Sequence, residues 1–241
     1  GLNGTESMPI VIQGAGDATV FEGDACCNTV EITDSSHVVI RKIKVDGKGI
    51  DGVFGVSAKG SSANTVHHIT IEDSTFVGQN ASQQTVGIST KTPTFGWIIR
   101  RNVIDGAGTG MYLGNSNHAE PFVGGLIEHN LVRNTIGYDI QIKDQDTWPD
   151  HPALPKSDAK TIIRHNVFLK NDQPSPDGPR PNLFVGGLPP SGPGAGDSVE
   201  IYGNFISHNS VDEGLIQAAG RVSIHDNVLV DASDEAVLLT S

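Results

Sequence analysis

The segment YDIQIKDQDTWPDH, residues 138–151, brings together the residue types of an acid–base site. Asp139 and Lys143 have the same parity in a predicted strand, so both side chains are expected on its outward face. Asp144 and Asp146 follow at the start of a long loop that carries Trp148 and His151. A lysine is a candidate general base, closely spaced carboxylates suit Ca²⁺, and an exposed tryptophan suits stacking on a sugar ring. Two alternatives remain open: the aspartates cap a turn, and the tryptophan packs on the fold.

A repeated sequence motif indicates the structural element that positions this segment. The stretch IIRRNVIDG (98–106) returns as LIEHNLVRN (126–134), IIRHNVFLK (162–170), EIYGNFISH (200–208) and SIHDNVLVD (223–231), and two degenerate copies precede it. Successive copies are mostly about 23 to 30 residues apart, with two longer steps, which matches one turn of a β-solenoid with variable loops. In each copy a short strand precedes the asparagine and another follows it. The asparagine is expected at the corner between them.

A third strand per repeat closes the coil. It is predicted in GVSAK (55–59), GISTK (87–91), MYLGN (111–115), DIQIK (139–143), NLFVG (182–186) and LIQAA (215–219). Aligned positions on successive coils lie about 4.8 Å apart. The outward column at the end of this strand then contains Thr33, Lys59, Lys91, Asn115, Lys143, Gly186 and Ala219. Like charges on neighbouring rungs repel, which favours a groove for an anionic chain; a solvated lysine face neutralised by nearby aspartates is the alternative.

The strand before the asparagine has a different outward column. Its charges alternate through Arg41, Glu72, Arg100, Glu128 and Arg164. Opposite charges on neighbouring rungs stabilise strand pairing, so this column is interpreted as structural.

The repeat resembles the right-handed parallel β-helix of the pectate-lyase-like superfamily over essentially the entire chain. The resemblance implies an all-β fold of about eight coils with three strands per coil. It also implies an internal ladder of stacked asparagines, namely Asn102, Asn130, Asn166, Asn204 and Asn227. The opening GTESMPIVIQGAG has a weaker resemblance to alginate- and chondroitin-type polysaccharide lyases, which implies a secreted or cell-surface protein that acts on an acidic polysaccharide.

The resemblance favours a polysaccharide lyase, in which a Lys or Arg base removes the proton alpha to a carboxylate and a cation neutralises the acid group. We predict catalytic roles for Lys143, Asp139 and Asp144, with Lys91, Lys59 and His118 as alternative bases, and Ca²⁺ bound by Asp144 and Asp146. Substrate contacts are expected from Lys59, Lys91, Asn115, His118, Gln141, Trp148 and His151. No complete catalytic motif is present. A noncatalytic glycan-binding or structural solenoid and a polygalacturonase-like hydrolase therefore remain alternatives, although the aspartate pair, His and Arg-x-Lys pattern of the latter family is absent.

The amino-acid composition excludes some classes of binding partner. The net charge of −12 and pI near 5.0 argue against duplex nucleic acid as a partner. No stretch approaches the roughly 20 apolar residues of a membrane span. Cys26 and Cys27 are adjacent, and buried free thiols are expected. Residues 1–241 are interpreted as one β-helix domain whose ends lack caps. Uncapped strand edges need cover, so we expect either that these residues are a segment of a longer chain or that loops, adjoining domains or a partner subunit cover the ends.

Overall fold

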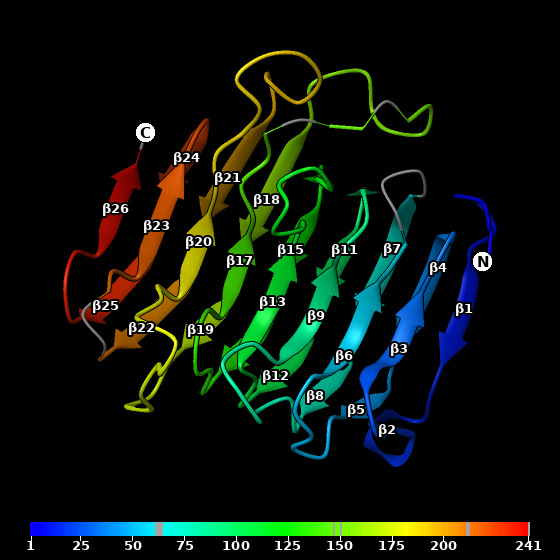
Figure 1. Cartoon of the computed structure of the whole chain (residues 1–241), viewed down its shortest axis with the longest axis horizontal. Coiled ribbons are helices and arrows are strands. Elements are labelled where there is room, and N and C mark those ends of the chain that lie inside the picture. The colour runs from blue at the N-terminus through cyan, green and yellow to red at the C-terminus, as the bar shows by residue number, and fades with distance from the viewer. Residues whose placement is uncertain (61–64, 147, 150, 211–212, 241) are drawn as a thin grey trace.

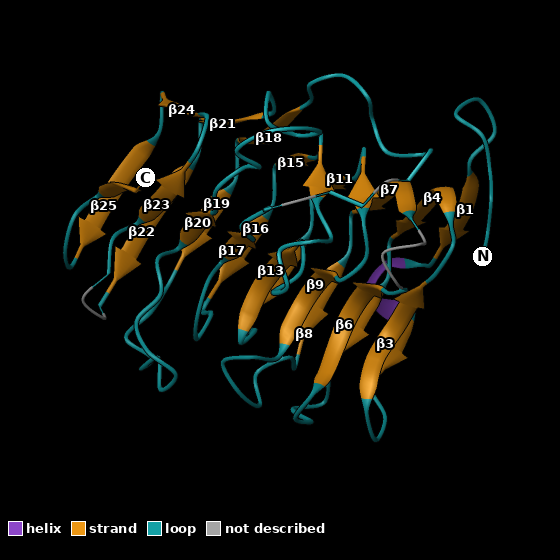
Figure 2. Ribbon diagram, turned by 45° about the horizontal axis from the view of Figure 1, so that its top comes forward, coloured by secondary structure: helices purple, strands orange, loops and turns teal. Residues whose placement is uncertain are grey.

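The computed structural model describes residues 1–60, 65–146, 148–149, 151–210 and 213–240. The chain winds into a right-handed parallel β-helix, in which three sheets of parallel strands enclose one apolar core (Figures 1 and 2). Two sheets have eight strands each, so the prediction of about eight coils with three strands each is confirmed. A short 3-10 turn, η1 (Gly16–Ala18), is the helical element of the described residues, and no described helix has the length and apolar character needed to cross a membrane.

The first sheet, here called sheet A, holds the strands that precede the asparagines. In spatial order it contains β1 (Ile10–Gln13), β4 (Ser36–Arg41), β7 (Val66–Glu72), β11 (Ile98–Arg100), β15 (Leu126–Glu128), β18 (Lys160–Arg164), β21 (Ser198–Tyr202) and β24 (Val222–His225). The short strand β10 (Thr94–Phe95) pairs with β7 on one side and with β14 (Phe122–Val123) on the other.

The second sheet, sheet B, follows the asparagine corner. It contains β2 (Val20–Glu22), β5 (Lys44–Asp46), β8 (Thr75–Val77), β12 (Val103–Asp105), β16 (Leu131–Arg133), β19 (Val167–Leu169), β22 (Phe205–Asn209) and β25 (Val228–Ala232).

The third sheet, sheet C, closes each coil. It contains β3 (Cys27–Ile32), β6 (Val53–Ala58), β9 (Val86–Thr90), β13 (Thr109–Leu113), β17 (Ile140–Ile142), β20 (Leu183–Val185), β23 (Ile216–Ala219) and β26 (Val237–Thr240).

The corner between sheets A and B explains the asparagine in each repeat. A residue with positive φ precedes it, as at Arg101 (53°) and His165 (53°), and this turns the chain inward. The amide Nδ2 of Asn102 donates to Oδ1 of Asn130 at 3.1 Å, and that of Asn130 donates to Asn166 at 2.9 Å. The column continues through Asn204 to Asn227. The four asparagines from 102 to 204 are at most 2% exposed, so each buried amide depends on its neighbours for partners.

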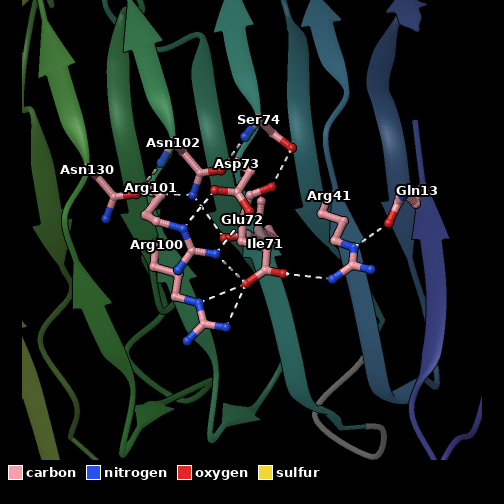
Figure 3. Close-up of polar contacts among 10 residues, drawn as sticks. All are labelled: Gln13, Arg41, Ile71, Glu72, Asp73, Ser74, Arg100, Arg101, Asn102 and Asn130. Carbon is pink, nitrogen blue, oxygen red and sulfur yellow. Dashed lines mark hydrogen bonds and ion pairs between the residues drawn. The ribbon is translucent and has the colours of Figure 1, made fainter. Parts of the chain in front are cut away.

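The alternating charges of sheet A form ion pairs across the rungs (Figure 3). Glu72, whose side chain is 5% exposed, accepts from Arg100 at 2.7 Å and from Arg101 at 3.0 Å, and it lies 3.5 Å from Arg41. Arg164 pairs with Glu128 at 2.7 Å. Burial opposes ionisation of Glu72, but the hydrogen bonds and charges of the two neighbouring arginines outweigh it and lower its pKa. These contacts support the structural interpretation of this column.

The two cysteines differ from the prediction. Cys26 and Cys27 are exposed and form a disulfide with each other, so the expectation of buried free thiols is wrong. Cys27 adopts a φ of 82°, a backbone conformation that is uncommon outside glycine. The first and last coils carry exposed apolar side chains, among them Met8, Val11, Val228 and Leu239.

Candidate functional site

A groove with a volume of about 390 Å³ lies on the outer face of sheet C. Its floor comes from β6, β9, β13 and β17 and from the residues that flank these strands. The lining residues are aromatic, amide, hydroxyl and cationic, with one aliphatic member: Phe54, Gln83, Gln84, Val86, Lys91, Thr109, Tyr112, Ser116, Tyr138, Gln141, Lys143 and Arg180. None of them is an aspartate or glutamate.

Parallel register aligns the floor of the groove. Tyr112 pairs with Gln141 on one side and with Ser89 on the other, and the buried hydroxyl of Ser89 lies 2.7 Å from that of Ser57. Two residues further along the strands lies the lysine column. Lys91 follows Lys59 on the next rung, since Ala58 pairs with Thr90.

One position of the predicted lysine column is wrong. The backbone N–H of Lys143 donates to the carbonyl of Leu113, so Gly114, and not Asn115, occupies the rung between Lys91 and Lys143. Gly114 has a φ of +87°, and a Cβ there would lie 3.2 Å from the Cβ of Lys143. Glycine therefore leaves a gap between the two lysines. Asn115 instead turns to Glu120, to which its amide donates at 3.0 Å.

A tyrosine lies between the two groove lysines. The Nζ atoms of Lys91 and Lys143 lie 5.7 and 5.8 Å from the ring centroid of Tyr112, and that of Lys91 also lies 4.5 Å from the ring of Phe54. Neither lysine has a salt-bridge partner among the residues that the structure describes. Burial, reinforced by the charge of Lys59, lowers the pKa of Lys91. Burial raises the pKa of Tyr112.

One wall of the groove is formed by the loop between β19 and β20. Its Arg180 guanidinium lies 5.7 Å from the ring of Tyr138. The loop crosses to an earlier coil, where Gln83 donates to the carbonyl of Gly178 at 3.0 Å and accepts from the N–H of Asp177 at 2.9 Å. These contacts fix the loop against residues nearly one hundred positions earlier.

The carbonyl of Arg180 is held from inside the coil. It accepts from Nζ of Lys170 and from the amide of Asn209, both at 2.8 Å. Lys170 is only 6% exposed, and the negative charge that acts on it most strongly is that of Asp139. Burial lowers the pKa of Lys170 to about 8, while Asp139 acts in the opposite direction. Lys170 thus positions Arg180 without touching the groove.

Asp139 lies inside the coil, so its predicted outward placement is wrong. The residue immediately precedes β17 and aligns with Gly55, Gly87 and Gly110 of earlier coils. A Cβ at these glycines would meet the core side chains Phe76, Ile104 and Val132, so the aligned position faces inward. Its carboxylate is 0% exposed and accepts from Thr135 at 2.7 Å and from Asn182 at 2.9 Å. Burial raises its pKa to about 7, against the effect of Lys170. Direct contact with a substrate is not open to Asp139.

The aspartates predicted to bind calcium have protein partners. Asp144 accepts from the N–H of Gly187 at 2.9 Å, and Asp146 lies 3.0 Å from Nδ1 of His118. Asp144 therefore links its loop to the next coil, and both the turn-cap alternative and the calcium site remain predictions. His118 is engaged with Asp146 and does not line the groove.

The loop with Trp148 and His151 extends away from the groove. Trp148 packs with Phe95, Val123 and Leu154 on the outside of sheet A, and its indole N–H donates to Gln145. The charge of His151 contributes to lowering the pKa of His67. The packing alternative therefore fits Trp148. Of the predicted site residues, the groove brings together Lys91, Lys143 and Gln141, and Lys59 neighbours Lys91.

Comparisons with known proteins give a fold match without a sequence match. No protein-family model and no curated protein sequence matches the chain. The solved structures it resembles include an alginate lyase from Paenibacillus sp. str. FPU-7, with a TM-score of 0.53 and 14% identity over 98% of this chain and 86% of that one. Another is the GH136 lacto-N-biosidase from Eubacterium ramulus, with a TM-score of 0.51 and 10% identity over 99% of this chain and 59% of that one. The shared feature is the parallel β-helix.

Tyr112, Tyr138, Phe54 and Arg180 belong to the groove and were not predicted. The alignment of repeats missed Tyr112, because it put Asn115 in the lysine column, three residues after the tyrosine, whereas Gly114 occupies that rung in the structure, two residues after it. Arg180 lies in a proline- and glycine-rich loop outside the repeat, where no alignment of coils gives its position.

Proposed function

We propose that the sheet C groove binds an acidic polysaccharide and cleaves it by β-elimination. The observation that supports this most strongly is a cavity with Lys91, Lys143 and Arg180 at its surface, aromatic rings beside all three, and no carboxylate among the lining residues that the structure describes. Such a site attracts uronate carboxylates electrostatically, while Tyr112 and Tyr138 offer ring faces to the sugar. The folds of the alginate lyase and the lacto-N-biosidase are compatible with a carbohydrate ligand.

In β-elimination a base removes the proton on the carbon alpha to the uronate carboxylate. Negative charge then develops on the carboxylate, the glycosidic oxygen leaves and takes a proton, and a carbon–carbon double bond forms in the sugar. A general base needs a pKa near the working pH, and a general acid must keep its proton until the leaving group needs it. The two roles require neighbouring groups with opposite shifts in pKa.

Lys91 and Tyr112 meet this requirement better than the other groove residues. Burial and Lys59 lower the pKa of Lys91, which increases its neutral amine fraction; the ring of Phe54 acts in the opposite sense by favouring the ammonium. Burial raises the pKa of Tyr112, so its hydroxyl stays protonated at neutral pH and can donate to the leaving oxygen. We therefore propose Lys91 as base and Tyr112 as acid.

Lys143 and Arg180 are proposed to neutralise the substrate carboxylate. Both are cationic groups of the groove, and stabilisation of charge that develops in the transition state contributes strongly to catalysis. Lys143, the base predicted from the sequence, is thus proposed to bind charge, and Lys91, predicted as an alternative, takes the role of base. A polygalacturonase-like hydrolase would need two carboxylates about the scissile bond, and the described part of the groove lining has none.

The location proposed is outside the cell or at its surface, where the Cys26–Cys27 disulfide would persist. The test of function is a panel of acidic and neutral polysaccharides, each with added Ca²⁺ or with a chelator. Products with ultraviolet absorbance from the new double bond support the lyase. New reducing ends without that absorbance indicate hydrolysis, binding without products indicates a glycan-binding solenoid, and absence of binding to every acidic polymer contradicts the proposal.

A further inference from the structure

Three histidines from two neighbouring strands of sheet A form a compact cluster outside the groove. They are His37 of β4 and His67 and His68 of β7. One ring nitrogen from each lies within 4.8 Å of the others, and the Nδ1 atoms of His67 and His68 are 2.8 Å apart. β4 and β7 lie side by side in Figure 1, so the parallel register brings His37 beside residues about thirty positions later.

Backbone geometry directs all three side chains to the same side. Two consecutive residues of a regular strand point to opposite faces. Here His37 and His68 are aligned in the register, and both have positive φ, 52° and 51°. The kink at His68 turns its ring outward beside that of His67, while Val66 and Ile69 on either side of the pair remain buried in the core.

The surroundings support the cluster and leave room for it. His67 stacks on Phe95, with 4.4 Å between the ring centroids, and His37 stacks on His68 at 4.5 Å. Gly96, the next position in the column, has a φ of +64°, and a Cβ there would come within 3.0 Å of the His68 ring. His37 and His67 are partly buried and His68 is exposed, so His68 has the most room to reorient.

Burial and neighbouring charge lower the pKa of two of the three imidazoles. Burial, followed by the charges of His68, His37 and His151, lowers the pKa of His67 to about 4. Burial and His37 lower the pKa of His68, although Glu6 opposes this. Imidazoles must be neutral to bind a metal ion. The ion pairs of sheet A, by contrast, lie at the other end of the strands, at Glu72 and its arginines.

We propose that His37, His67 and His68 form a binding site for a divalent transition-metal ion of the zinc type. Zn–N bonds of about 2.0–2.1 Å in a tetrahedral site place ligand nitrogens about 3.3 Å apart. The His67–His68 separation is already near this value, and side-chain rotation of the partly buried His37 and the exposed His68 closes the rest. An all-imidazole set selects zinc, copper or nickel over calcium or magnesium. The site ties two coils together and lies near His151.

This site is independent of the proposed function, because its ligands belong to sheet A and none lines the groove. The test is titration of the untagged full chain with Zn²⁺, without reductant so that the cysteines remain bonded, followed by calorimetry. Co²⁺ is the spectroscopic probe, since its visible absorption reports tetrahedral coordination. We expect one ion per chain.

The variants are chosen to preserve the fold. His67→Phe keeps an aromatic ring on Phe95 and removes the nitrogens, and the double variant H37N/H68N keeps residues that tolerate positive φ. Each should weaken Zn²⁺ binding by about 100-fold or more, given that even outer-shell partners account for about 10–100-fold. His129→Asn, in an exposed stacked pair with His165 at the corner that follows sheet A, is the matched control and should bind as the parent does.

Thermal unfolding provides a second readout. Zn²⁺ should raise the melting temperature of the parent and of His129→Asn but not that of His67→Phe or of H37N/H68N. Absence of stoichiometric Zn²⁺ binding by the parent would overturn the proposal. So would binding by His67→Phe and the double variant with the parent's affinity and cobalt spectrum.

Discussion

Lys91 and Lys143 lie on the coils either side of Tyr112, with their Nζ atoms 5.7 and 5.8 Å from its ring centroid. The two lysines are two rungs apart, which corresponds to about 9.6 Å along the solenoid axis. Gly114 occupies the rung between them and leaves the tyrosine accessible from the groove. A chain with repeated negative charges that runs along the axis would meet both cations and the ring.

Removing the lysine column should abolish binding without harming the fold. In K59A/K91A/K143A the repulsion between Lys59 and Lys91 disappears, so the melting temperature should stay unchanged or rise. Affinity for acidic oligosaccharides, measured by calorimetry at low salt, should be lost. The control is Lys48→Ala, an exposed lysine paired with Glu22 at 3.1 Å, and unaltered glycan affinity in the triple variant would rule out the groove.

Arg180 should depend on the buried lysine that holds its carbonyl. Lys170→Met keeps most of the side-chain volume but removes the donor to Arg180 and leaves Asp139 without its cationic neighbour. We expect a loss of about 1–3 kcal/mol in unfolding free energy and weaker binding of acidic glycan. Arg180→Gln should weaken glycan binding while changing stability by less than about 1 kcal/mol, because its guanidinium bonds are exposed. Equal glycan affinity in both variants and the parent would show that Arg180 does not contact the ligand.

The asparagine column should be sensitive to loss of one member. Asn166→Leu removes the acceptor for Asn130 and the donor to Asn204, both buried. The expected cost is about 1–3 kcal/mol, measured by urea unfolding. Asn171→Leu is the control, since this partly exposed asparagine lies outside the column. A cost no larger than that of the control would show that the column does not stabilise the coil.

Glu72 should make stability depend on pH (Figure 3). Its pKa is lower in the folded protein than in the unfolded chain, so its contribution is present above about pH 4.5 and is lost as the pH falls through the folded pKa. Glu72→Gln should reduce the unfolding free energy by about 1–3 kcal/mol at pH 7, and the difference from the parent should shrink in acid. Glu22→Gln, in an exposed pair, should cost less than about 1 kcal/mol. A Glu72→Gln deficit that is constant from pH 7 to pH 3 would contradict this assignment.

Most of the fold could be predicted from the sequence because the same motif recurs in each coil. The isoleucine three residues before each asparagine aligned β11, β15, β18, β21 and β24 in the register found here, since Ile99 pairs with Ile127, Ile127 with Ile163, and Ile163 with Ile201. The same alignment placed Lys59 beside Lys91. It failed where the repeat breaks: at Asp139, before the strand, and at Gly114, where the column shifts by one residue.

The histidine cluster and the wall of the groove depend on backbone conformation and on long-range contacts. His37 and His68 become neighbours through the register of β4 with β7, but their outward direction depends on the positive φ that both adopt. Arg180 reaches the groove through a loop fixed by Gln83 and by the buried Lys170. Neither the histidine cluster nor the position of Arg180 in the groove could be predicted from composition and residue spacing.

The measurement that tests the central claim most directly is the initial rate of ultraviolet-absorbing product from an acidic polysaccharide, for the parent and Lys91→Ala at saturating substrate. Loss of a positioned base should lower kcat by about 10²–10⁴-fold with a smaller change in KM, and Lys143→Ala should raise KM because it removes carboxylate binding. Lys48→Ala serves as the control for lost surface charge. A parent that forms no such product from any acidic polymer, or a Lys91→Ala variant that forms it at the parent's rate, would contradict the assignment of Lys91 as the base of a β-elimination.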